Sequence, residues 1–593
     1  MPFTPNKHAA LRVVQGRLAY SDYIGGSQDD EVGAMAVDSS GAVYLLGFTG
    51  SPDFPLNNGS IPPIPAGGYP SRYGYLLKIN PDGSAPVFAT YFGGAYDVNR
   101  FNDLKVDSSG NIFIAGACGE GFPTTPGTVG SAYNITDYDS FGLLAKLKPD
   151  GTNFLYATYI AGAGQAGQFT DIDKIQIASD GSVYALGDTS SLAFPTTPGV
   201  VGRTSVLVNG SGYNSLFLVK INPSATQYVY ATYLDNLVPS SAPSMGGYIS
   251  FNDMAIDAAG NVILAGQATA AGISTTSNAY QAIMKGSTGN GFIYKLSSNA
   301  SSVLYASYFG GSGTDGINAM VLDADGNIVL AGATSSADFP TTPDGFMASA
   351  PNPYHYSTSS TDYTQPQTGF VAKLNPALGN GANQLVYSTY YGGLGGASER
   401  SEVDLIKIDS SGNLIFTGSS SASTFPVKNE ILPGFFANQK EQPFVASFDK
   451  TGHSLLFSMA LTAPYSSFDG INALVCDSSG SFYLSGSTLS YGVYGAQLSS
   501  LTNELGWNKN QIYLMKFAPG QNSSRSIFVS SLRNPSNAVD AGVYGLELIL
   551  SLSGGDAAAQ GIWSWCDGSV CNDLPIWILL CRIKSRASVA WFM

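Results

Sequence analysis

The chain has 593 residues, of which 44% are hydrophobic and 12% are charged, and its formal net charge is −15 with 27 Lys and Arg side chains. So few basic groups cannot neutralise a phosphate backbone, and a nucleic-acid partner is therefore not expected. Membrane insertion is not expected either. The 70 Gly and 31 Pro favour short strands and tight turns over long helices, and five Cys do not form a disulfide framework.

From the N-terminus onward, residues 1–10 are expected to be an extension, and the first 16 residues contain no apolar stretch of signal-peptide length. A glycine pair with a spacing of six residues then recurs seven times. The first member usually ends an Asp-Ser-Ser-Gly type of turn and the second ends a short apolar run. The pairs are Gly41/Gly47, Gly110/Gly116, Gly181/Gly187, Gly260/Gly266, Gly326/Gly332, Gly412/Gly418 and Gly480/Gly486. A mean period of about 73 residues indicates a repeat architecture.

The second repeat shows what one unit contains. Residues 103–107 alternate apolar and polar side chains, and a turn at 108–110 leads into the apolar run 112–116. A second hairpin joins residues 142–147 to 154–159 through Lys-Pro-Asp-Gly. Four sequential antiparallel strands form one blade of a β-propeller. A parallel β-helix is the main alternative, but its coils are much shorter than this unit.

The predicted fold is therefore all-β, a propeller of seven to eight four-stranded blades whose ring is closed by terminal strands. The propeller should span residues 11–555, with repeats near 33–92, 100–160, 170–234, 251–310, 316–392, 401–460 and 470–532. Residues 11–24 and 540–555 remain as fragments, and together they would make a partial closing blade. The strand count therefore favours eight blades. Residues 556–593 lose the repeat pattern and form a divergent tail.

Several residue types recur at fixed places, and each has a structural explanation. An Asp opens the first hairpin turn, where its carboxylate can accept backbone N–H groups. A Lys on the third strand should pack between blades or pair with a carboxylate, a Tyr on the fourth strand should pack, and a Phe-Pro pair should end the second strand and anchor the connection. The turn aspartates are Asp38, Asp107, Asp257, Asp323, Asp409 and Asp477, and the third-strand lysines are Lys78, Lys146, Lys220, Lys295, Lys373 and Lys516. The fourth-strand tyrosines are Tyr23, Tyr91, Tyr159, Tyr233, Tyr308 and Tyr390, and the Phe of the Phe-Pro pairs are Phe54, Phe122, Phe194, Phe339 and Phe425.

Acidic residues in the connection that leads into the first strand are the ligand or calcium candidates. Asp30, Asp315 and Asp469 occupy equivalent places, and Asp29, Asp171 and Glu402 lie close by. Such carboxylates could bind Ca²⁺ with backbone carbonyls, but capping of the loop is the simpler role, and no cofactor is required by the sequence. In a meander these connections share a face with the long ones, which include residues 128–141, 200–215 and 344–368. Recognition is expected on this long-loop face.

The ordered motifs Tyr308-Phe309-Gly310-Gly311, Asp323-Ala324-Asp325-Gly326-Asn327 and Asp338-Phe339-Pro340-Thr341-Thr342-Pro343 recur across residues 18–532. In this arrangement the chain resembles the SBBP beta-propeller repeat family of bacterial and archaeal surface proteins, and it is more weakly similar to NHL repeats. The resemblance implies a propeller that is usually extracellular, and it brings no established catalytic residues.

Two functions remain open. The chain could be a monomeric, non-catalytic surface or secreted protein that binds a protein or a polysaccharide, or it could be a polysaccharide lyase or hydrolase that uses a pair of carboxylates near the central channel. His8, His355 and His453 are scattered, so no catalytic residue is assigned. A cluster of acid, Tyr and Arg at the channel would favour the enzyme, and Arg100 and Arg400 are the basic residues to examine there.

Overall fold

The computed structural model describes residues 16–55, 73–92, 99–119, 121–131, 140–162, 169–205, 214–234, 249–269, 271–286, 288–351, 367–393, 400–422, 424–430, 441–461, 470–488, 497–502, 509–519, 528–533, 547–551, 559–567 and 570–578. Residues 16–519 form one compact unit, and the described strands that follow belong to a second unit.

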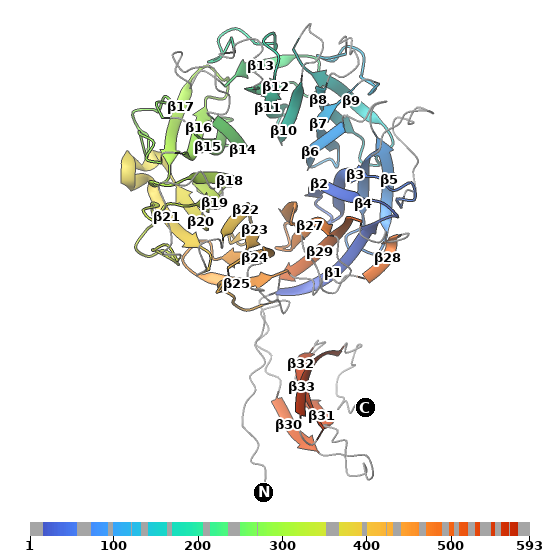
Figure 1. The fold of residues 1–593 in the computed structure, drawn as a ribbon. Helices are drawn as coiled ribbons and strands as arrows, with labels where there is room; N and C mark the ends of the chain where they lie inside the picture. The colour runs from blue at the N-terminus through green and yellow to red at the C-terminus, as the bar shows by residue number, and fades with distance from the viewer. Residues whose placement is uncertain are drawn as a thin grey trace. The chain divides into compact units, whose positions relative to one another are not determined.

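The first unit is a seven-bladed β-propeller whose sheets are arranged around a central axis, with the first strand of each blade innermost (Figure 1). Blade 1 contains β2 (Asp30–Val37), β3 (Val43–Thr49), β4 (Tyr73–Ile79) and β5 (Pro86–Phe92). Blade 2 contains β6 (Asn99–Val106), β7 (Ile112–Cys118), β8 (Phe141–Leu147) and β9 (Phe154–Ile160). Blade 3 contains β10 (Thr170–Ile177), β11 (Val183–Thr189), β12 (Ser215–Ile221) and β13 (Tyr228–Tyr233).

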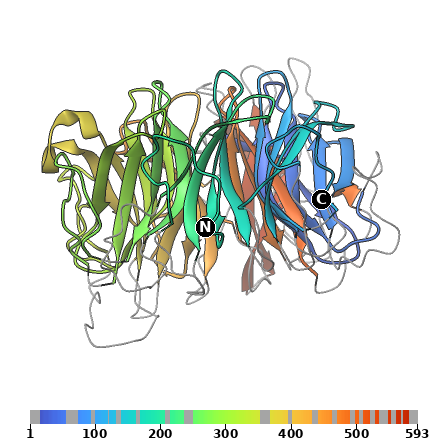
Figure 2. The same cartoon turned by 90° about the horizontal axis from the view of Figure 1, so that it is seen from above.

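Blade 4 contains β14 (Ile249–Ile256), β15 (Val262–Ala268), β16 (Asn290–Leu296) and β17 (Val303–Phe309). Blade 5 contains β18 (Asp315–Leu322), β19 (Ile328–Thr334), β20 (Thr368–Leu374) and β21 (Leu385–Tyr391), with the short 3-10 turns η2 (Pro376–Leu378) and η3 (Gly381–Gln384) before its last strand. Blade 6 contains β22 (Ser401–Ile408), β23 (Leu414–Ser420), β24 (Gln442–Phe448) and β25 (Leu455–Ala460). In the edge-on view, the strands run between the two faces of the ring (Figure 2).

The seventh blade closes the ring with a strand from the other end of the chain. Its strands are β26 (Ala473–Cys476), β27 (Phe482–Thr488), β29 (Gln511–Pro519) and β1 (Gly16–Gly25), which pairs antiparallel with β29. A further strand, β28 (Gln497–Thr502), pairs parallel with the outer side of β1. The sequence pattern had placed two strands in residues 11–23 and a fourth strand of this blade before residue 532. In the described part of this stretch the structure has one strand, β1, in the outer position of the seventh blade, so the propeller has seven blades, the lower of the two numbers expected.

After residue 519 the described strands form two hairpins. One joins β30 (Phe528–Arg533) to β31 (Glu547–Ser551), and the other joins β32 (Ala559–Asp567) to β33 (Val570–Ile578). No described helix is long and apolar enough to cross a membrane.

A β-bulge explains why the second glycine of each pair recurs. In blade 1, Val32 pairs with Gly47 and Ala34 pairs with Leu46, which leaves Gly33 as an extra residue of the inner strand. A Cβ on Gly47 would lie 2.0 Å from the carbonyl oxygen of Glu31, so only glycine fits opposite the bulge. The same register shift occurs in the inner strands of blades 2 to 6. Because the bulge interrupts the alternation, these strands begin several residues before the stretch that the sequence pattern identified.

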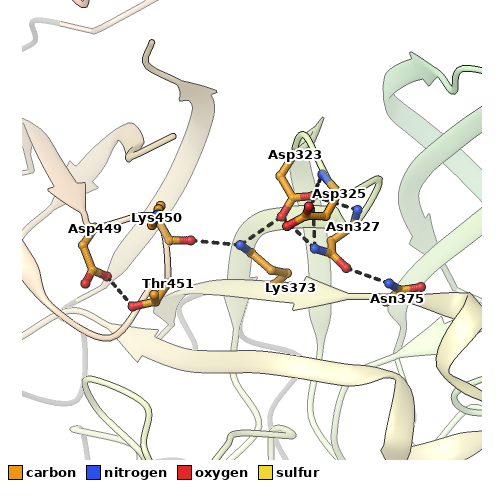
Figure 3. A network of polar contacts seen from close by, with 8 residues as sticks. All are labelled: Asp323, Asp325, Asn327, Lys373, Asn375, Asp449, Lys450 and Thr451. Carbon is orange, nitrogen blue, oxygen red and sulfur yellow. Dashed lines mark hydrogen bonds and ion pairs between the residues drawn. The ribbon is translucent and has the colours of Figure 1, made fainter. Parts of the chain in front are cut away.

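The recurring Asp and Lys pair with each other near the end of the inner strand that is opposite to the bulge. Asp323 Oδ1 accepts hydrogen bonds from the backbone N–H groups of Asp325 and Asn327, and its other oxygen lies 3.0 Å from Lys373 Nζ (Figure 3). The same ammonium donates to the carbonyl oxygen of Lys450 in the next blade. Lysines of three other blades pair with their own turn aspartate, in the pairs Lys78–Asp38, Lys146–Asp107 and Lys295–Asp257. The predicted structural role of these residues is confirmed.

The Tyr of the fourth strand anchors the connection that follows the second strand. Tyr233 donates to the carbonyl oxygen of Ser191 and accepts from the N–H of Phe194. Phe194 in turn stacks on Phe217 of the third strand, with ring centroids 4.4 Å apart. The predicted packing roles of the Tyr and the Phe-Pro pair are thus confirmed in this blade, and Tyr390, Phe339 and Phe370 repeat the arrangement in blade 5.

The first part of each long connection joins adjacent blades. In blade 2, Thr125 N–H bonds to the carbonyl of Ala157 in the outermost strand, and Val129 N–H then bonds to the carbonyl of Ala225 in the β12–β13 turn of blade 3. Val201 contacts Ala300 of blade 4 in the same way. These segments therefore run along the outside of the ring toward the short turns and contact the following blade. The remainder of these connections, up to the next strand, lies mostly outside the described residues.

Candidate functional site

The inner strands can be compared residue by residue from the end at the long-loop face. We number their positions 1 to 8, starting at Asp30 in β2 and at Asn99, Thr170, Ile249, Asp315 and Ser401 in β6, β10, β14, β18 and β22. In blade 7 the equivalent of position 1 is Asp469, which lies outside the described residues. Position 4 is the bulge residue, and position 8 leads into the Asp-Ser-Ser-Gly type of turn.

Position 1 is a capping position. Asp315 is buried, and its Oδ2 accepts hydrogen bonds from Gly311 N–H (2.9 Å), Asn290 Nδ2 (2.7 Å) and Ser336 Oγ (3.0 Å). Asp30 is buried in the same way and accepts from Gly26 N–H and Ser51 Oγ. Burial is the main cause that raises the pKa of each carboxyl to about 6. Both aspartates hold the connection between blades, as the simpler reading of the sequence expected.

Asp29 also joins two blades. Its Oδ1 accepts from the N–H of Asn510, and its Oδ2 lies 3.3 Å from Lys509 Nζ. These contacts fix the connection before β2 to the start of β29 across the closure of the ring.

In several blades, position 4 carries an asparagine that links the blade to the next one. Asn102 donates to the carbonyl of Ile172 (3.0 Å), Asn252 to that of Ile317 (2.8 Å), and Asn318 to that of Val403 (3.1 Å). The bulge brings about this contact because the extra residue turns its side chain toward the neighbouring inner strand. Blade 1 has Gly33 at this position, and blades 3 and 6 carry Asp173 and Asp404.

Asp173 belongs to a group that we call the Arg100 cluster: Arg100, Asn102, Asp171, Asp173 and Asp188. Asn102 Nδ2 donates to Asp171 Oδ1 at 2.8 Å, and the Arg100 guanidinium lies 3.7 Å from Asp171 Oδ2. Asp188 is the cross-strand partner of Asp171 on β11 and pairs with Asn214. The Arg100 side chain is 63% exposed, whereas that of Asp171 is 4% exposed. The cluster therefore presents a cation to solvent above partly buried acids.

The acids of the Arg100 cluster share an unfavourable environment for negative charge. Burial, followed by repulsion from Asp171 and Asp188, raises the pKa of Asp173 to about 7. Burial also raises the pKa of Asp171 to about 6, although the hydrogen bond from Asn102 and the charge of Arg100 oppose this change. The pKa of Asp188 is raised by burial as well. Carboxyl groups that titrate near neutrality are characteristic of functional sites.

Blade 6 carries a second group, the Arg400 cluster: Arg400, Glu402, Asp404, Ser419 and Glu441. Arg400 Nη2 donates to both carboxylate oxygens of Glu441, at 3.0 and 2.9 Å, and Ser419 Oγ donates to Glu441 at 2.6 Å. Burial and the charges of Glu402 and Glu441 raise the pKa of Asp404 to about 7. This group too comes from the long-loop ends of three adjacent strands, β22, β23 and β24.

Between these groups, two blades leave space at the same level. Position 2 is Arg100, Asp171 and Glu402 in blades 2, 3 and 6, but Gly316 in blade 5 and Gly470 in blade 7. A Cβ on either glycine would meet no atom closer than 3.9 Å. The axial mouth on the long-loop face thus combines charged side chains with unfilled space.

Only some of the acidic residues that the sequence suggested as ligand or calcium candidates belong to the two clusters. Asp171 and Glu402 enter the two clusters, whereas Asp29, Asp30 and Asp315 form contacts between blades. In the part of the chain that the structure describes, no three His, Cys, Asp or Glu side chains come together in a way that could hold a metal ion. The calcium site stays a prediction.

The sequence analysis missed Asp173, Asp188, Asp404 and Glu441. A signal for two of them exists in the repeat itself. Once the inner strands are aligned by their second glycines, Asp173 and Asp404 stand where four other blades have Asn102, Asn252, Asn318 and Asn472. Asp188 and Glu441 follow no repeated pattern, so only the fold could assign them.

The fold and the two clusters define a seven-bladed propeller with a polar axial mouth. No protein-family model matches the chain, and no curated protein matches it. Among solved structures, polysaccharide lyase Uly1 shares 9% identity at a TM-score of 0.44, over 86% of this chain and 99% of that chain. An ulvan lyase of the PL25 family, bound to -[GlcA(1-4)Rha3S]-, shares 9% identity at 0.26, over 90% and 93%. A europium-containing methanol dehydrogenase shares 10% identity at 0.34, over 85% and 94%. These values are too low to support an inference about function.

Proposed function

We propose that this propeller binds a polysaccharide at the axial mouth of its long-loop face without converting it. The observation that carries the proposal is the pair of departures from the repeat at that mouth, the Arg100 and Arg400 clusters. Structural roles in this molecule recur from blade to blade, but these two groups do not. Carboxylates and guanidinium groups can hydrogen-bond several sugar hydroxyls at once.

Charge narrows the class of ligand. The chain has a net charge of −15, and each cluster has three carboxylates for one arginine. A polyanion would be repelled, so the ligand is a neutral or amino-substituted polysaccharide. We further propose an extracellular or cell-surface location and membership of the SBBP repeat family, on the resemblance of the repeat motifs.

A glycan array with the purified propeller tests the proposal, and Gly316→Trp is the specific variant. The indole should occupy the unfilled space at the mouth and abolish binding, because no atom lies within 3.9 Å of its Cβ. Gly326→Trp, at a turn on the opposite face, is the matched control and should bind as the wild type does. Equal glycan binding by both variants and the wild type would place the ligand elsewhere.

A polysaccharide lyase or hydrolase is the second candidate, and the raised pKa of Asp173 and of Asp404 favours it. A carboxyl group that titrates near pH 7 can act as a general acid or base. Incubation of the bound polysaccharide with the protein, followed by measurement of new reducing ends and of absorbance from unsaturated products, separates the two functions. Turnover that is lost in Asp173→Asn or Asp404→Asn would establish the enzyme.

A further inference from the structure

A second polar group lies deeper in the ring, on positions 5 and 7 of the inner strands. It contains three lysines from three blades, Lys105, Lys174 and Lys407, and two aspartates, Asp103 and Asp253. Lys407 of blade 6 interacts electrostatically with all four other residues, which belong to blades 2, 3 and 4. The five side chains therefore belong to inner strands around the axis and lie close enough to interact through their charges.

The two aspartates are held by the wall. Asp103 accepts from the N–H groups of Leu104 and, in the next blade, Ile175, and it lies 2.6 Å from Lys105 Nζ. Asp253 accepts in the same way from Met254 and Met320. The carboxylates serve first as braces between blades, which limits how they can turn toward the lysines.

Two ammonium groups lack such partners. Within the described residues, no hydrogen bond and no ion pair involves the Nζ atom of Lys174 or Lys407. Both side chains are only partly buried, and burial lowers the pKa of Lys407. An ammonium group in such a place needs a counter-charge or a water shell.

The remaining residues at positions 5 and 7 of the inner strands carry no charge that could pair with these ammonium groups. Apart from Gln176, whose amide donates to the carbonyl of Met254, these remaining residues are small or apolar. They are Ala34, Ala36, Ala255, Ala319, Val321, Leu405, Ala473 and Val475. With three ammonium groups and two carboxylates, the formal charge of these five residues is +1. Asp173, next to Lys174 on the strand, also interacts electrostatically with Lys174, but its pKa of about 7 leaves it partly protonated at neutral pH.

We propose that the axial channel binds a small inorganic anion between the ammonium groups of Lys105, Lys174 and Lys407. The anion neutralises the excess charge in a wall of low polarity, where a charge–charge interaction is stronger than in bulk water. The lysines lie below the axial mouth, since positions 5 and 7 are about 10–17 Å along the strand from position 2, and Asp173 at position 4 adjoins both levels. The site is close to the face that carries the short turns.

Bromide is a suitable probe because it scatters anomalously. Crystals of the wild type soaked in sodium bromide should show a peak within hydrogen-bond distance of at least two of the three ammonium groups. The peak should be absent from Lys407→Met and from Lys174→Met, while Lys148→Met, which changes an exposed turn lysine, should retain it. Surface bromide sites shared by all variants serve as internal controls for the soak.

A solution measurement covers the event that one variant does not crystallise. At constant ionic strength, replacing gluconate with bromide should raise the melting temperature of the wild type relative to that of Lys407→Met or Lys174→Met. An empty channel in the bromide-soaked wild type would overturn the proposal. So would a peak that persists when both Lys174 and Lys407 are replaced, or an equal response of all variants to bromide.

Discussion

Gly326 and Gly332 belong to the same hairpin but are glycines for different reasons. Gly326 has a φ of 77° in the turn, and a Cβ there would meet nothing within 4 Å. Gly332 faces the bulge, where a Cβ would lie 2.0 Å from the carbonyl oxygen of Gly316. The conformational freedom of glycine is required in one case and its lack of volume in the other.

We therefore expect Gly332→Ala to destabilise the protein more than Gly326→Ala does. A left-handed alanine costs about 1–2 kcal/mol. A Cβ forced against backbone requires two strands to separate, and we expect a cost at or above the upper end of the 1–3 kcal/mol that is typical of overpacking. Thermal melting of the two variants under identical conditions provides the comparison. An equal or larger loss for Gly326→Ala would contradict the bulge as the reason for the second glycine.

The raised pKa values of Asp173 and Asp404 predict a dependence of stability on pH. Each pKa is about 7 in the folded protein, whereas an unfolded Asp has a pKa near 3.9. Between about pH 4 and 7 the folded state therefore holds more protons, so the contribution of these groups to stability falls as the pH rises through this window. A rise of about 3 in the pKa corresponds to a loss of at most about 4 kcal/mol for each group, and solvent screening at these partly exposed side chains reduces this value.

The variant Asp173→Asn/Asp404→Asn tests this dependence, because asparagine is the residue that other blades carry at the same position. Its melting temperature should exceed that of the wild type more at pH 8 than at pH 5. A constant difference across this range would show that the two carboxyl groups have ordinary pKa values in the folded protein.

At the scale of the element, strands and hairpins could be predicted well from the sequence. The turn Asp, the first glycine and the apolar runs are local signals, and β7, β8 and β9 lie within two residues of their predicted bounds. The bulges could not be predicted, because an extra residue looks like a break in alternation. The contacts of the long connections with the next blade could not be predicted either, since they join residues distant in sequence.

The fourth-strand tyrosines give a test at this scale. Tyr233→Phe removes the bond to Ser191 and leaves the N–H of Phe194 without its acceptor in a buried place, so we expect a loss of about 1–3 kcal/mol. Tyr230→Phe on the same strand is the control. The Tyr230 hydroxyl is buried and has no hydrogen-bond partner among the described residues, so its removal should be neutral or stabilising. Urea unfolding monitored by fluorescence measures both, and a similar loss in the two variants would deny the anchoring role.

At the scale of the whole molecule, the sequence predicted that terminal strands close the ring, but not which blade the N-terminal strand completes. Terminal strands were expected to close the ring, and β1 does so. The chain segments that pair, residues 16–25 with 511–519, lie almost 500 residues apart. No local pattern distinguishes the outer strand of a seventh blade from part of an eighth. The two charged clusters could not be predicted from local patterns either, since they form where side chains of neighbouring strands meet.

Removing β1 should open the ring. A chain that starts at Gln28 lacks the outer partner of β29, and exposed strand edges pair with other molecules. We expect a lower melting temperature and a larger hydrodynamic size by light scattering. A synthetic peptide of residues 16–25 added in trans should reverse both changes, whereas a scrambled peptide should not. A truncated chain that melts and scatters like the full chain would show that closure does not depend on β1.

Many of the side chains that join neighbouring blades reach in the same direction around the ring. Asn102, Asn252 and Asn318 reach the following blade, as do Asp103, Asp253 and Lys373, and so do the connections at Val129 and Val201. These side chains donate to the following blade in the case of the Asn and Lys residues and accept from it in the case of Asp103 and Asp253, so each blade has different contacts with its successor and with its predecessor. A chimaera in which one blade is exchanged would have two unlike junctions, and compatibility at one would say nothing of the other. During synthesis from the N-terminus, every blade from the second to the seventh can dock on the blade before it, and only the junction from the seventh to the first must wait for the ring to close.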